Sequence, residues 1–441
     1  MNNQFKLTPR HYTTMPEILH KMASVVGRHT GIVRKVFPVE QPAPFDILHY
    51  YNATLGQTLI LGCQWALPWS YGGIAWTPGE AIAAAIGEAV ERYACGIYSK
   101  ETFLYATYRE VADFAIPLKY LTLYTPEQYK EQGVAPPSPD TRLHWVKGYS
   151  LTYRRTVLVP AALVFVPYRF STGEDFIIGE STSTGAACGG SVEEAVLSGL
   201  HENVERDAMM LTWLNCLPAP RVPVETVEQP LIIAASQRLA NTSYRLVVNN
   251  ITTDIPLATF LATLINENEA SPYLVVAAAC SLDKQRALLK AVAEVLQGAQ
   301  VARTLLERYP EFESDQPIRT LEEHTLLYAK FDLRERLAFL VDNSTQSWAT
   351  IPHWASGEVK TDVETVVRLL FESGYEVIVV DITPPEVREC GLVVIKTLVP
   401  GLVPLYSREA YRPLGVQRVS QTPLALGYRV QAINPFPHPF P

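Results

Sequence analysis

The sequence predicts an α+β fold of mixed sheets and helices that includes an internal repeat of two acidic helices. Of the 441 residues, 48% are apolar, which is enough for a large core. Stretches with helical periodicity alternate along the chain with short β-rich runs. Helices are expected at 15–26, 78–98, 192–215, 284–308 and 362–373, and strands at 156–167, 244–249, 273–280 and 376–381.

Residues 1–60 carry little periodicity beyond their short helix and are interpreted as an N-terminal segment that leads into the main domain. Residues 61–441 are expected to form that domain and to end in a proline-rich tail. The polar, proline-containing stretches at 134–141 and 218–230 predict loops rather than linkers between independent domains. The last eight residues, NPFPHPFP, alternate proline with aromatic or imidazole side chains, which favours polyproline II.

Charge and cysteine content exclude several broad classes of protein. The formal net charge of −8 argues against a general nucleic-acid binder, because phosphate affinity needs a basic surface. Six cysteines are scattered singly without a C-x-x-C pair, so we expect reduced thiols rather than a zinc site or a disulfide framework. The longest apolar run, 273–280, is too short to span a bilayer, and the first residues lack a signal-peptide core. A cytoplasmic protein without a membrane partner is therefore expected.

The repeat relates TPGEAIAAAIGEAVERYA (77–94) to SVEEAVLSGLHENVERDA (191–208), at an offset of 114 residues and without a gap. Seven of the 18 aligned positions are identical. Each copy opens with the pattern of a capping box, formed by Thr77 with Glu80 in the first and by Ser191 with Glu194 in the second. Both copies are therefore predicted to be helices that start at the same relative point.

The carboxylates of each predicted helix fall within about 80° of one another, opposite an apolar face. They are Glu80, Glu88 and Glu91 in the first copy and Glu194, Glu202 and Glu205 in the second. Arg92 and Arg206 follow Glu88 and Glu202 by four residues, where an ion pair can form. A single E-x-x-E-R motif is most often a solvated acidic face. Its duplication favours two walls of one site, and clustered carboxylates suit a divalent cation such as Mg²⁺.

Two further segments could contact phosphate. The small-residue stretch STSTGAACGG (181–190) leads into the second acidic helix, where backbone amides can receive an anion, although a plain turn is the commoner role. Cys188 within it is interpreted as a small packed residue rather than a nucleophile. Lys290 and Glu294 lie four residues apart on the helix predicted at 284–308, and an ordinary surface ion pair is their default role.

Taken in order, these motifs resemble the YcaO family of cyclodehydratases. The resemblance rests on the two E-x-x-E-R helices, the helix with ALLKAVAE (287–294), the segment GLVVIKTLVPGLVPL (391–405) and the terminal Pro-x-Pro-x-Pro, and it extends from about Val25 to the last residue. Each motif is weakly specific alone, whereas the ordered set is highly specific. The main domain is then expected to be a YcaO catalytic domain, with both acidic helices around one nucleotide site.

The resemblance implies ATP and Mg²⁺ as cofactors. It assigns Mg²⁺, and through it the ATP phosphates, to Glu88, Glu91, Glu202 and Glu205. It assigns nucleotide contacts to Glu194, Lys290 and Glu294, and to Arg92 and Arg206 either nucleotide contacts or the orientation of these carboxylates. Three positions depart from the usual family pattern, namely Ala84 in place of Ser, Gly190 in place of Asn and Lys290 in place of Arg. Lysine keeps the charge of arginine but loses its bidentate fork. These departures bear on nucleotide contacts more than on the metal site.

The implied reaction is the ATP-dependent conversion of Cys, Ser or Thr residues of a ribosomally made precursor peptide into thiazoline or oxazoline rings. In this scheme Pro437, Pro439 and Pro441 form a stiff arm that places the terminal carboxylate near the reacting groups. His438 is interpreted as a spacer residue, with participation in the reaction as the alternative. Thioamide- or amidine-forming chemistry within the family remains an alternative, as does a non-catalytic nucleotide-binding accessory subunit.

The resemblance also implies partners. A separate protein is expected to deliver the leader region of the precursor peptide, because the sequence shows no adenylating-enzyme-like or zinc-ribbon region. A flavin dehydrogenase that oxidises the azolines is compatible with the family, and a homodimer is expected. No nucleic-acid partner is expected.

Overall fold

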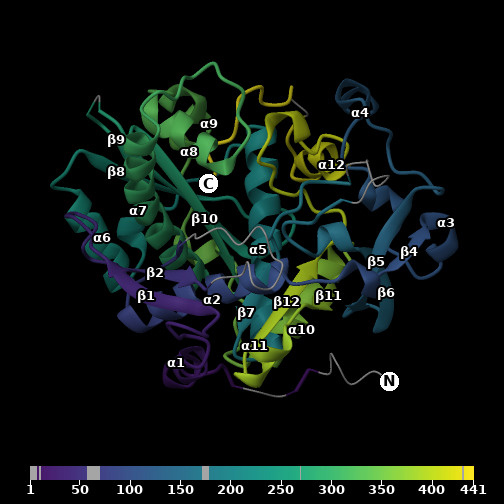
Figure 1. Cartoon of the computed structure of the whole chain (residues 1–441). Coiled ribbons are helices and arrows are strands. Elements are labelled where there is room, and N and C mark those ends of the chain that lie inside the picture. The colour runs from purple at the N-terminus through teal and green to yellow at the C-terminus, as the bar shows by residue number, and fades with distance from the viewer. Residues whose placement is uncertain (1–6, 9–10, 57–69, 171–177, 269, 430–431) are drawn as a thin grey trace.

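The computed structural model describes residues 7–8, 11–56, 70–170, 178–268, 270–429 and 432–441. Within them, helices surround three antiparallel sheets (Figure 1), which confirms the predicted α+β class. The helices are α1 (Met15–Ala23), α2 (Pro78–Gly96), α3 (Tyr108–Val111), α4 (Pro126–Gln132), α5 (Val192–Leu214), α6 (Pro230–Leu239), α7 (Lys284–Arg308), α8 (Leu321–Lys330), α9 (Ala338–Val341), α10 (Val359–Glu372), α11 (Pro385–Glu389) and α12 (Arg418–Ala425).

The strands pair only in the antiparallel sense within each of these sheets. The first sheet has the order β1-β2-β3, the second β10-β9-β8, and the third β4-β5-β11-β12-β7 with β6 beside β5. The strands are β1 (Val33–Val39), β2 (His49–Leu55), β3 (Ser70–Ala75), β4 (Leu104–Thr107), β5 (Arg142–Ser150), β6 (Arg155–Pro160), β7 (Ala186–Gly189), β8 (Tyr244–Asn250), β9 (Ala258–Asn266), β10 (Leu274–Ser281), β11 (Ile378–Asp381) and β12 (Val393–Leu398).

Most of the expected elements are present with small shifts at their ends. The strand predicted at 156–167 is the main difference, because β6 ends at Pro160 and the chain turns into a short 3₁₀ helix at Ala161–Leu163. The helix predicted at 15–26 ends at Ala23, and the one predicted at 362–373 already starts at Val359. Hydrophobic periodicity therefore located the elements better than it located their ends.

Both copies of the repeat are helices, as predicted, and each opens on its predicted N-cap residue. The Thr77 hydroxyl accepts a hydrogen bond from the Glu80 amide at 3.3 Å, and the Ser191 hydroxyl accepts one from the Glu194 amide at 3.2 Å. Helix α2 packs on β2 and β3, while α5 packs on β7, β12, β10 and α10. Figure 1 shows α5 running through the middle of the molecule. The second copy is therefore a core helix rather than a surface helix.

The N-terminal segment is joined to the main body. Strands β1 and β2 form one sheet with β3, which directly precedes α2. The backbone amide of Thr8 donates to the buried carboxylate of Glu193 at 2.7 Å, at the start of α5. The domain boundary predicted at residue 60 lies outside the described residues, and it stays a prediction.

In the described residues, no helix has the length and apolar content that crossing a membrane requires. Cys95, Cys188, Cys216, Cys280 and Cys390 are free thiols, as predicted. Burial raises the pKa of Cys188 to about 12, so this thiol stays protonated at neutral pH, as expected of a packed residue.

A buried ion pair fixes the C-terminal half of α5 against α12. The Arg418 guanidinium donates to both oxygens of Asp207 at 2.7–2.9 Å, and the two side chains are only 3% and 0% exposed. Asp207 also accepts from the Val403 amide at 2.9 Å. One carboxylate thereby holds α5, α12 and the segment after β12 together.

Substitution Asp207→Asn should lower the free energy of unfolding by about 1–3 kcal/mol, because Arg418 loses its fully buried carboxylate partner and keeps only the partly exposed Asp254 as a counter-ion. Glu372 pairs with Arg368 on the surface of α10 and is 55% exposed, so Glu372→Gln is a matched control that should change stability by less than about 1 kcal/mol. Urea denaturation of both variants measures the difference. Equal effects would show that the Asp207–Arg418 pair contributes no more than a surface ion pair.

Candidate functional site

The glutamates of the repeat lie beside the arginines that follow them, as the spacing predicted. On α2, Arg92 lies 3.4 Å from Glu88 and 3.6 Å from Glu91. On α5, Arg206 lies 3.7 Å from Glu202 and 3.5 Å from Glu205. Each helix thus presents two carboxylates with one guanidinium between them.

Each of the two arginine–glutamate groups contributes at least one side chain to the wall of one cavity. Arg92 from α2 and Glu202 and Arg206 from α5 line a cavity of about 690 Å³, together with 181–184 and the last residue, Pro441. Glu202 acts electrostatically on both Glu88 and Glu91, whose pKa values it raises. The predicted arrangement of two helices as two walls of one site therefore agrees with the structure.

The acidic groups near this cavity repel one another. Burial, reinforced by the charges of Glu202 and Glu88, raises the pKa of Glu91 to about 8, although Arg92 acts against the increase. The pKa of Glu88 is raised too, chiefly by burial. A divalent cation near these carboxylates would relieve both the repulsion and the unmet charge.

Glu205 is directed from α5 toward α7 and is not among the residues that line the cavity. Its side chain is 1% exposed, accepts a hydrogen bond from the Cys280 amide at 3.2 Å and lies 3.6 Å from the Lys290 ammonium group. Lys290 also pairs with Glu294 at 3.5 Å. Burial, opposed by Lys290 and assisted by Glu205, raises the pKa of Glu294 to about 7. Lys290 and Glu294, predicted only from the family resemblance to lie near the nucleotide, are thus joined to the repeat through Glu205.

A single acidic helix face is usually solvated, whereas the Glu205 side chain is almost fully buried. Helix α5 is buried along most of its length, because β12, β7 and β10 cover different sides of it. Helical periodicity distinguished an apolar from an acidic face, but it carried no information on what would cover the acidic one.

Glu194 is not brought into the cluster. It lies eight residues before Glu202, and its carboxylate accepts hydrogen bonds from the Thr13 hydroxyl at 3.0 Å and from the Gly190 amide at 3.0 Å. These contacts anchor the N-terminal segment at the start of α5. The nucleotide contact that the family resemblance implies for Glu194 stays a prediction.

The stretch 181–190 combines loop and strand. Residues 181–184 line the cavity, whereas Ala186–Gly189 form β7, which pairs with β12. At the bend between them, the Gly185 amide donates to Glu202 at 3.0 Å. Gly185 has φ +83°, and a Cβ there would meet the Thr397 carbonyl oxygen at 2.3 Å, so only glycine fits. The predicted small-residue loop thus serves first to orient a carboxylate.

Lys396 was not singled out from the sequence beyond its place in the motif 391–405. It lies on β12, is 1% exposed, and donates from Nζ to the Thr182 carbonyl oxygen at 2.7 Å. Burial lowers the pKa of its ammonium group, while the Glu202 and Glu91 carboxylates act in the opposite direction. A lone lysine within an apolar strand is the signal that could have identified it, because lysine is almost never fully buried without a partner.

The proline-rich tail is packed into the protein rather than extended into solvent. Phe440 and His438 are fully buried, and the Phe440 ring lies edge-on to Trp213 of α5. Pro441 remains exposed, at the cavity that Glu202 lines. The tail thus ends at the acidic site, as the family resemblance implied for Pro437, Pro439 and Pro441.

Side-chain donors hold the tail by its carbonyl groups. Trp213 Nε1 donates to the Phe436 oxygen at 3.1 Å, Tyr328 donates to the Pro437 oxygen at 2.6 Å, and His324 Nδ1 lies 2.7 Å from the His438 oxygen. Proline has no N–H, so the backbone of every second tail residue can accept hydrogen bonds but cannot donate one. The tail therefore needs donors from elsewhere in the fold, and α5 supplies one of them.

His438 is an anchor of the tail. Its ring stacks on His324 with centroids 3.7 Å apart, its Nε2 lies 2.8 Å from the Tyr406 oxygen, and its Nδ1 accepts from the Phe440 amide at 3.2 Å. Burial lowers the pKa of His438, so the ring is neutral with its proton on Nε2. All of these contacts are structural, and they anchor the tail.

The donor set fits Mg²⁺ with a phosphate-bearing ligand better than a closed metal cage. Among the described residues, no three His, Cys, Asp or Glu side chains lie close enough together to hold a metal ion. Mg²⁺ is usually held by only one or two carboxylates and completed by water and phosphate oxygens. Arg206 Nε is buried without a hydrogen-bond acceptor in the described part of the chain, which leaves a donor for an anionic oxygen.

Comparison with known proteins agrees with this geometry. Residues 72–403 match the family described as YcaO cyclodehydratase, ATP- and Mg²⁺-binding. An uncharacterised protein of Methanothermobacter thermautotrophicus is 27% identical over 338 residues, which cover 75% of this chain and 81% of that protein.

Two solved structures share the fold. A heterocyclase in complex with substrate and cofactor has a TM-score of 0.82 and 26% identity, over 99% of this chain and 59% of its own. The YcaO protein of Methanopyrus kandleri bound with AMPPCP and Mg²⁺ has a TM-score of 0.62 and 21% identity, over 90% and 92% of the two chains. The chain thus spans 59% of the length of the heterocyclase.

The raised pKa of Glu91 predicts how stability depends on pH. Between the ordinary carboxyl range and about pH 8, folded Glu91 keeps a proton that the unfolded chain has lost, so metal-free stability should fall as pH rises through this window. Glu91→Gln removes this dependence and should raise the melting temperature at pH 8 by about 2–8 °C, with a smaller gain at pH 5. Thermal melts in EDTA measure both values.

The exposed Glu80 of the same helix supplies the control, because Glu80→Gln removes a carboxylate outside the cluster. Parallel pH profiles for the wild-type protein and Glu91→Gln would contradict the raised pKa.

Proposed function

The chain belongs to the YcaO family, and we propose that it is an ATP- and Mg²⁺-dependent cyclodehydratase that forms azoline rings from Cys, Ser or Thr residues of a ribosomally made peptide. One observation carries the proposal. Two arginine-paired carboxylate helices face a single cavity, and the C-terminal residue Pro441 ends at that same cavity. Nucleotide-binding and tail residues are thus adjacent, as a reaction that couples ATP to amide chemistry requires.

In the proposed reaction the peptide loses one water, while ATP is converted to ADP and phosphate. The side-chain sulfur or oxygen adds to the preceding carbonyl carbon and gives up its proton to a base. The carbonyl oxygen takes the γ-phosphoryl group of ATP, and ADP leaves. Loss of the amide proton and of phosphate then forms the C=N bond of the ring. Without activation a peptide oxygen is a poor leaving group, and its phosphorylation makes the elimination feasible.

We assign metal binding to Glu88 and Glu91 from α2 and Glu202 and Glu205 from α5. When bound, Mg²⁺ supplies charge neutralisation on the phosphoryl oxygens. Glu202 is oriented for this role by the Gly185 amide. Glu205 is the most buried of the four, and it also fixes Lys290 relative to α5.

We assign the phosphate oxygens to the arginines at the cavity. Arg92 and Arg206 both line it, and the Nε of Arg206 is a buried donor without an acceptor in the described residues. Lys290 and Glu294, beyond Glu205 on α7, are assigned to the remainder of the nucleotide. Preorganised cations of this kind stabilise charge that develops during phosphoryl transfer.

We assign proton abstraction to the terminal carboxylate of Pro441. The tail is fixed by hydrogen bonds at Phe436, Pro437 and His438, so little conformational freedom is left for the last residue. A base held in place avoids the entropic cost of finding the substrate in each turnover.

Partners of the enzyme are part of the proposal. The precursor peptide is the substrate, a separate protein delivers its leader region, and a homodimer is the expected assembly. A flavin dehydrogenase could oxidise the products. The heterocyclase with substrate and cofactor extends well beyond the part that this chain matches.

Phosphate release and peptide mass, measured together, test the function. Incubated with ATP, Mg²⁺, the leader-binding partner and a precursor peptide, the wild-type protein should release phosphate and remove one water per ring. Glu205→Gln should slow both by about 100-fold or more, because it removes buried charge from the site. Glu364→Gln, on the exposed face of α10, is the control and should leave both rates unchanged.

Three other results would exclude cyclodehydration. An exchange of oxygen for sulfur would indicate thioamide formation, and loss of water by amidine formation would be recognised by fragmentation of the peptide. Absence of phosphate release with partner and peptide present would indicate a non-catalytic accessory subunit.

Lengthening the C-terminus separates the role of the tail from nucleotide binding. Two glycines appended after Pro441 displace the terminal carboxylate but leave the anchors at 434–438 in place, so the cyclisation rate should fall by about 100-fold while ATP affinity stays within twofold. The same two glycines inserted before Met1 are the control. Unchanged cyclisation would remove the proposed role of the Pro441 carboxylate.

A further inference from the structure

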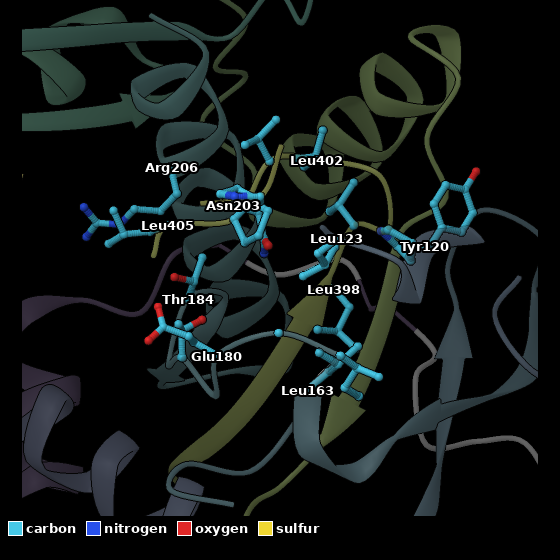
Figure 2. Close-up of a pocket in the computed structure, with 18 of the residues that line it drawn as sticks. Tyr120, Leu123, Leu163, Glu180, Thr184, Asn203, Arg206, Leu398, Leu402 and Leu405 are labelled. Carbon is cyan, nitrogen blue, oxygen red and sulfur yellow. The ribbon is translucent and has the colours of Figure 1, made fainter. Parts of the chain in front are cut away.

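A second cavity, of about 130 Å³, adjoins the one at the acidic helices. The two cavities share Glu180, Thr182, Thr184, Arg206 and Leu405 among their lining residues, so they lie next to each other. Figure 2 shows the shared residues Glu180, Thr184, Arg206 and Leu405 on one side of the second cavity. A ligand at the acidic helices could therefore extend directly into this space.

The far wall of the second cavity is apolar. Leu163 and Leu398 lie close together at one end, with Leu123 and Leu402 on the same side (Figure 2), and Ile178 completes this wall. These side chains come from separate elements, the 3₁₀ helix Ala161–Leu163, the end of β12 and the segment after it. An apolar cavity of about 150 Å³ can hold a benzene molecule, so this one has room for a branched aliphatic side chain.

Lys396 marks the polar end of the same cavity. Its Nζ donates one hydrogen bond, to Thr182, among the described residues, although an ammonium group carries three donors. Because Lys396 is fully buried, its two remaining N–H donors are shielded from bulk water. A buried cation of this kind favours an oxygen ligand that carries charge or acquires it.

The position of the proposed nucleotide contacts makes a nucleobase a poor occupant. Lys290 and Glu294 lie beyond Glu205, toward α7 and β10. The apolar cavity lies on the side of α5 that carries Asn203, whose amide donates to Thr397 of β12 at 2.8 Å. A nucleotide that contacts Lys290 therefore leaves this cavity to the other substrate.

We propose that the cavity binds the apolar side chain of the residue that precedes the ring-forming Cys, Ser or Thr in the peptide substrate, with Lys396 facing the carbonyl oxygen of that residue. This inference rests on the proposed function and adds to it a substrate preference. The side chain in question sits one bond from the carbonyl that reacts, so its pocket must adjoin the phosphoryl site, and this cavity does. Leu163, Leu398 and Leu402 then set the size of the residue accepted.

Photo-crosslinking tests the location without requiring turnover. The probe is a synthetic peptide with photoleucine directly before a serine, mixed at millimolar concentration with the full chain, Mg²⁺ and a non-hydrolysable ATP analogue. Adducts are expected on the cavity lining, at 116–124, 163 or 398–405, and should be lost with Leu398→Trp, which fills the cavity. Adducts confined to other regions, or unaffected by Leu398→Trp, would overturn the inference whether or not the protein is an enzyme.

Rates on a peptide panel test the preference. With Gly, Leu or Asp placed before the ring-forming residue, the wild-type protein should process the Leu peptide best and the Asp peptide worst. Leu163→Phe should slow the Leu peptide by about tenfold and the Gly peptide by less than twofold, because only the larger side chain competes for the filled space. Leu104→Phe, on the exposed edge strand β4, is the matched control and should change neither.

The outcomes separate the inference from the proposed function. Equal slowing of the Gly and Leu peptides by Leu163→Phe would overturn the inference while dehydration by the wild-type protein upholds the function. A tenfold loss of ATP affinity in the same variant would assign the cavity to the nucleobase and would also overturn it. If no peptide is dehydrated, the function fails, and the crosslink positions alone decide the occupant of the cavity.

Discussion

The buried charges of α5 constrain the whole structure. Glu205 and Asp207 lie two residues apart on this helix, are 1% and 0% exposed, and point to different cations. Lys290 and Arg206 lie beside Glu205, while Arg418 donates to Asp207 from Nε and Nη2. Burying a carboxylate costs several kcal/mol unless a charged partner and hydrogen bonds are present. Helices α7 and α12 must therefore dock against α5 in one register, and that register fixes the cavities between them.

The same helix connects the acidic site to the tail. Its middle turn carries Glu202 and Arg206 at the polar cavity, and Trp213, two turns later, donates to the tail carbonyl at Phe436. A helix is rigid over two turns, because its backbone is held by its own hydrogen bonds, so the distance between these two sites is fixed. The relation between Pro441 and the carboxylates is thus set by one rigid element and a few side-chain donors. A tail of alternating prolines suits this arrangement, since it accepts hydrogen bonds and loses little entropy on docking.

The sequence predicted what depends on local pattern and missed what depends on packing. The caps Thr77 and Ser191 and the pairs of Arg92 and Arg206 with their glutamates were predictable, because they involve residues three or four positions apart. The burial of Glu205, the use of Glu194 to hold the N-terminal segment and the place of Lys396 were not. Each of these depends on a partner more than 70 residues away, namely Cys280, Thr13 and Thr182. Duplication of the motif was the one sequence feature that indicated a contact of this range.

Different sides of α5 serve different parts of the site. Glu205 faces Cys280 of β10 and Lys290 of α7, whereas Asn203 is fixed to Thr397 of β12, beside the apolar cavity. Glu202 and Arg206 lie between these sides, at the polar cavity where Pro441 ends. Two substrates that bound on the same side would compete, while substrates on adjoining sides meet only at the middle turn. Under the proposed function, a helix buried on all of these sides would hold both substrates at fixed positions, in keeping with a second copy of the repeat that is more buried than the first.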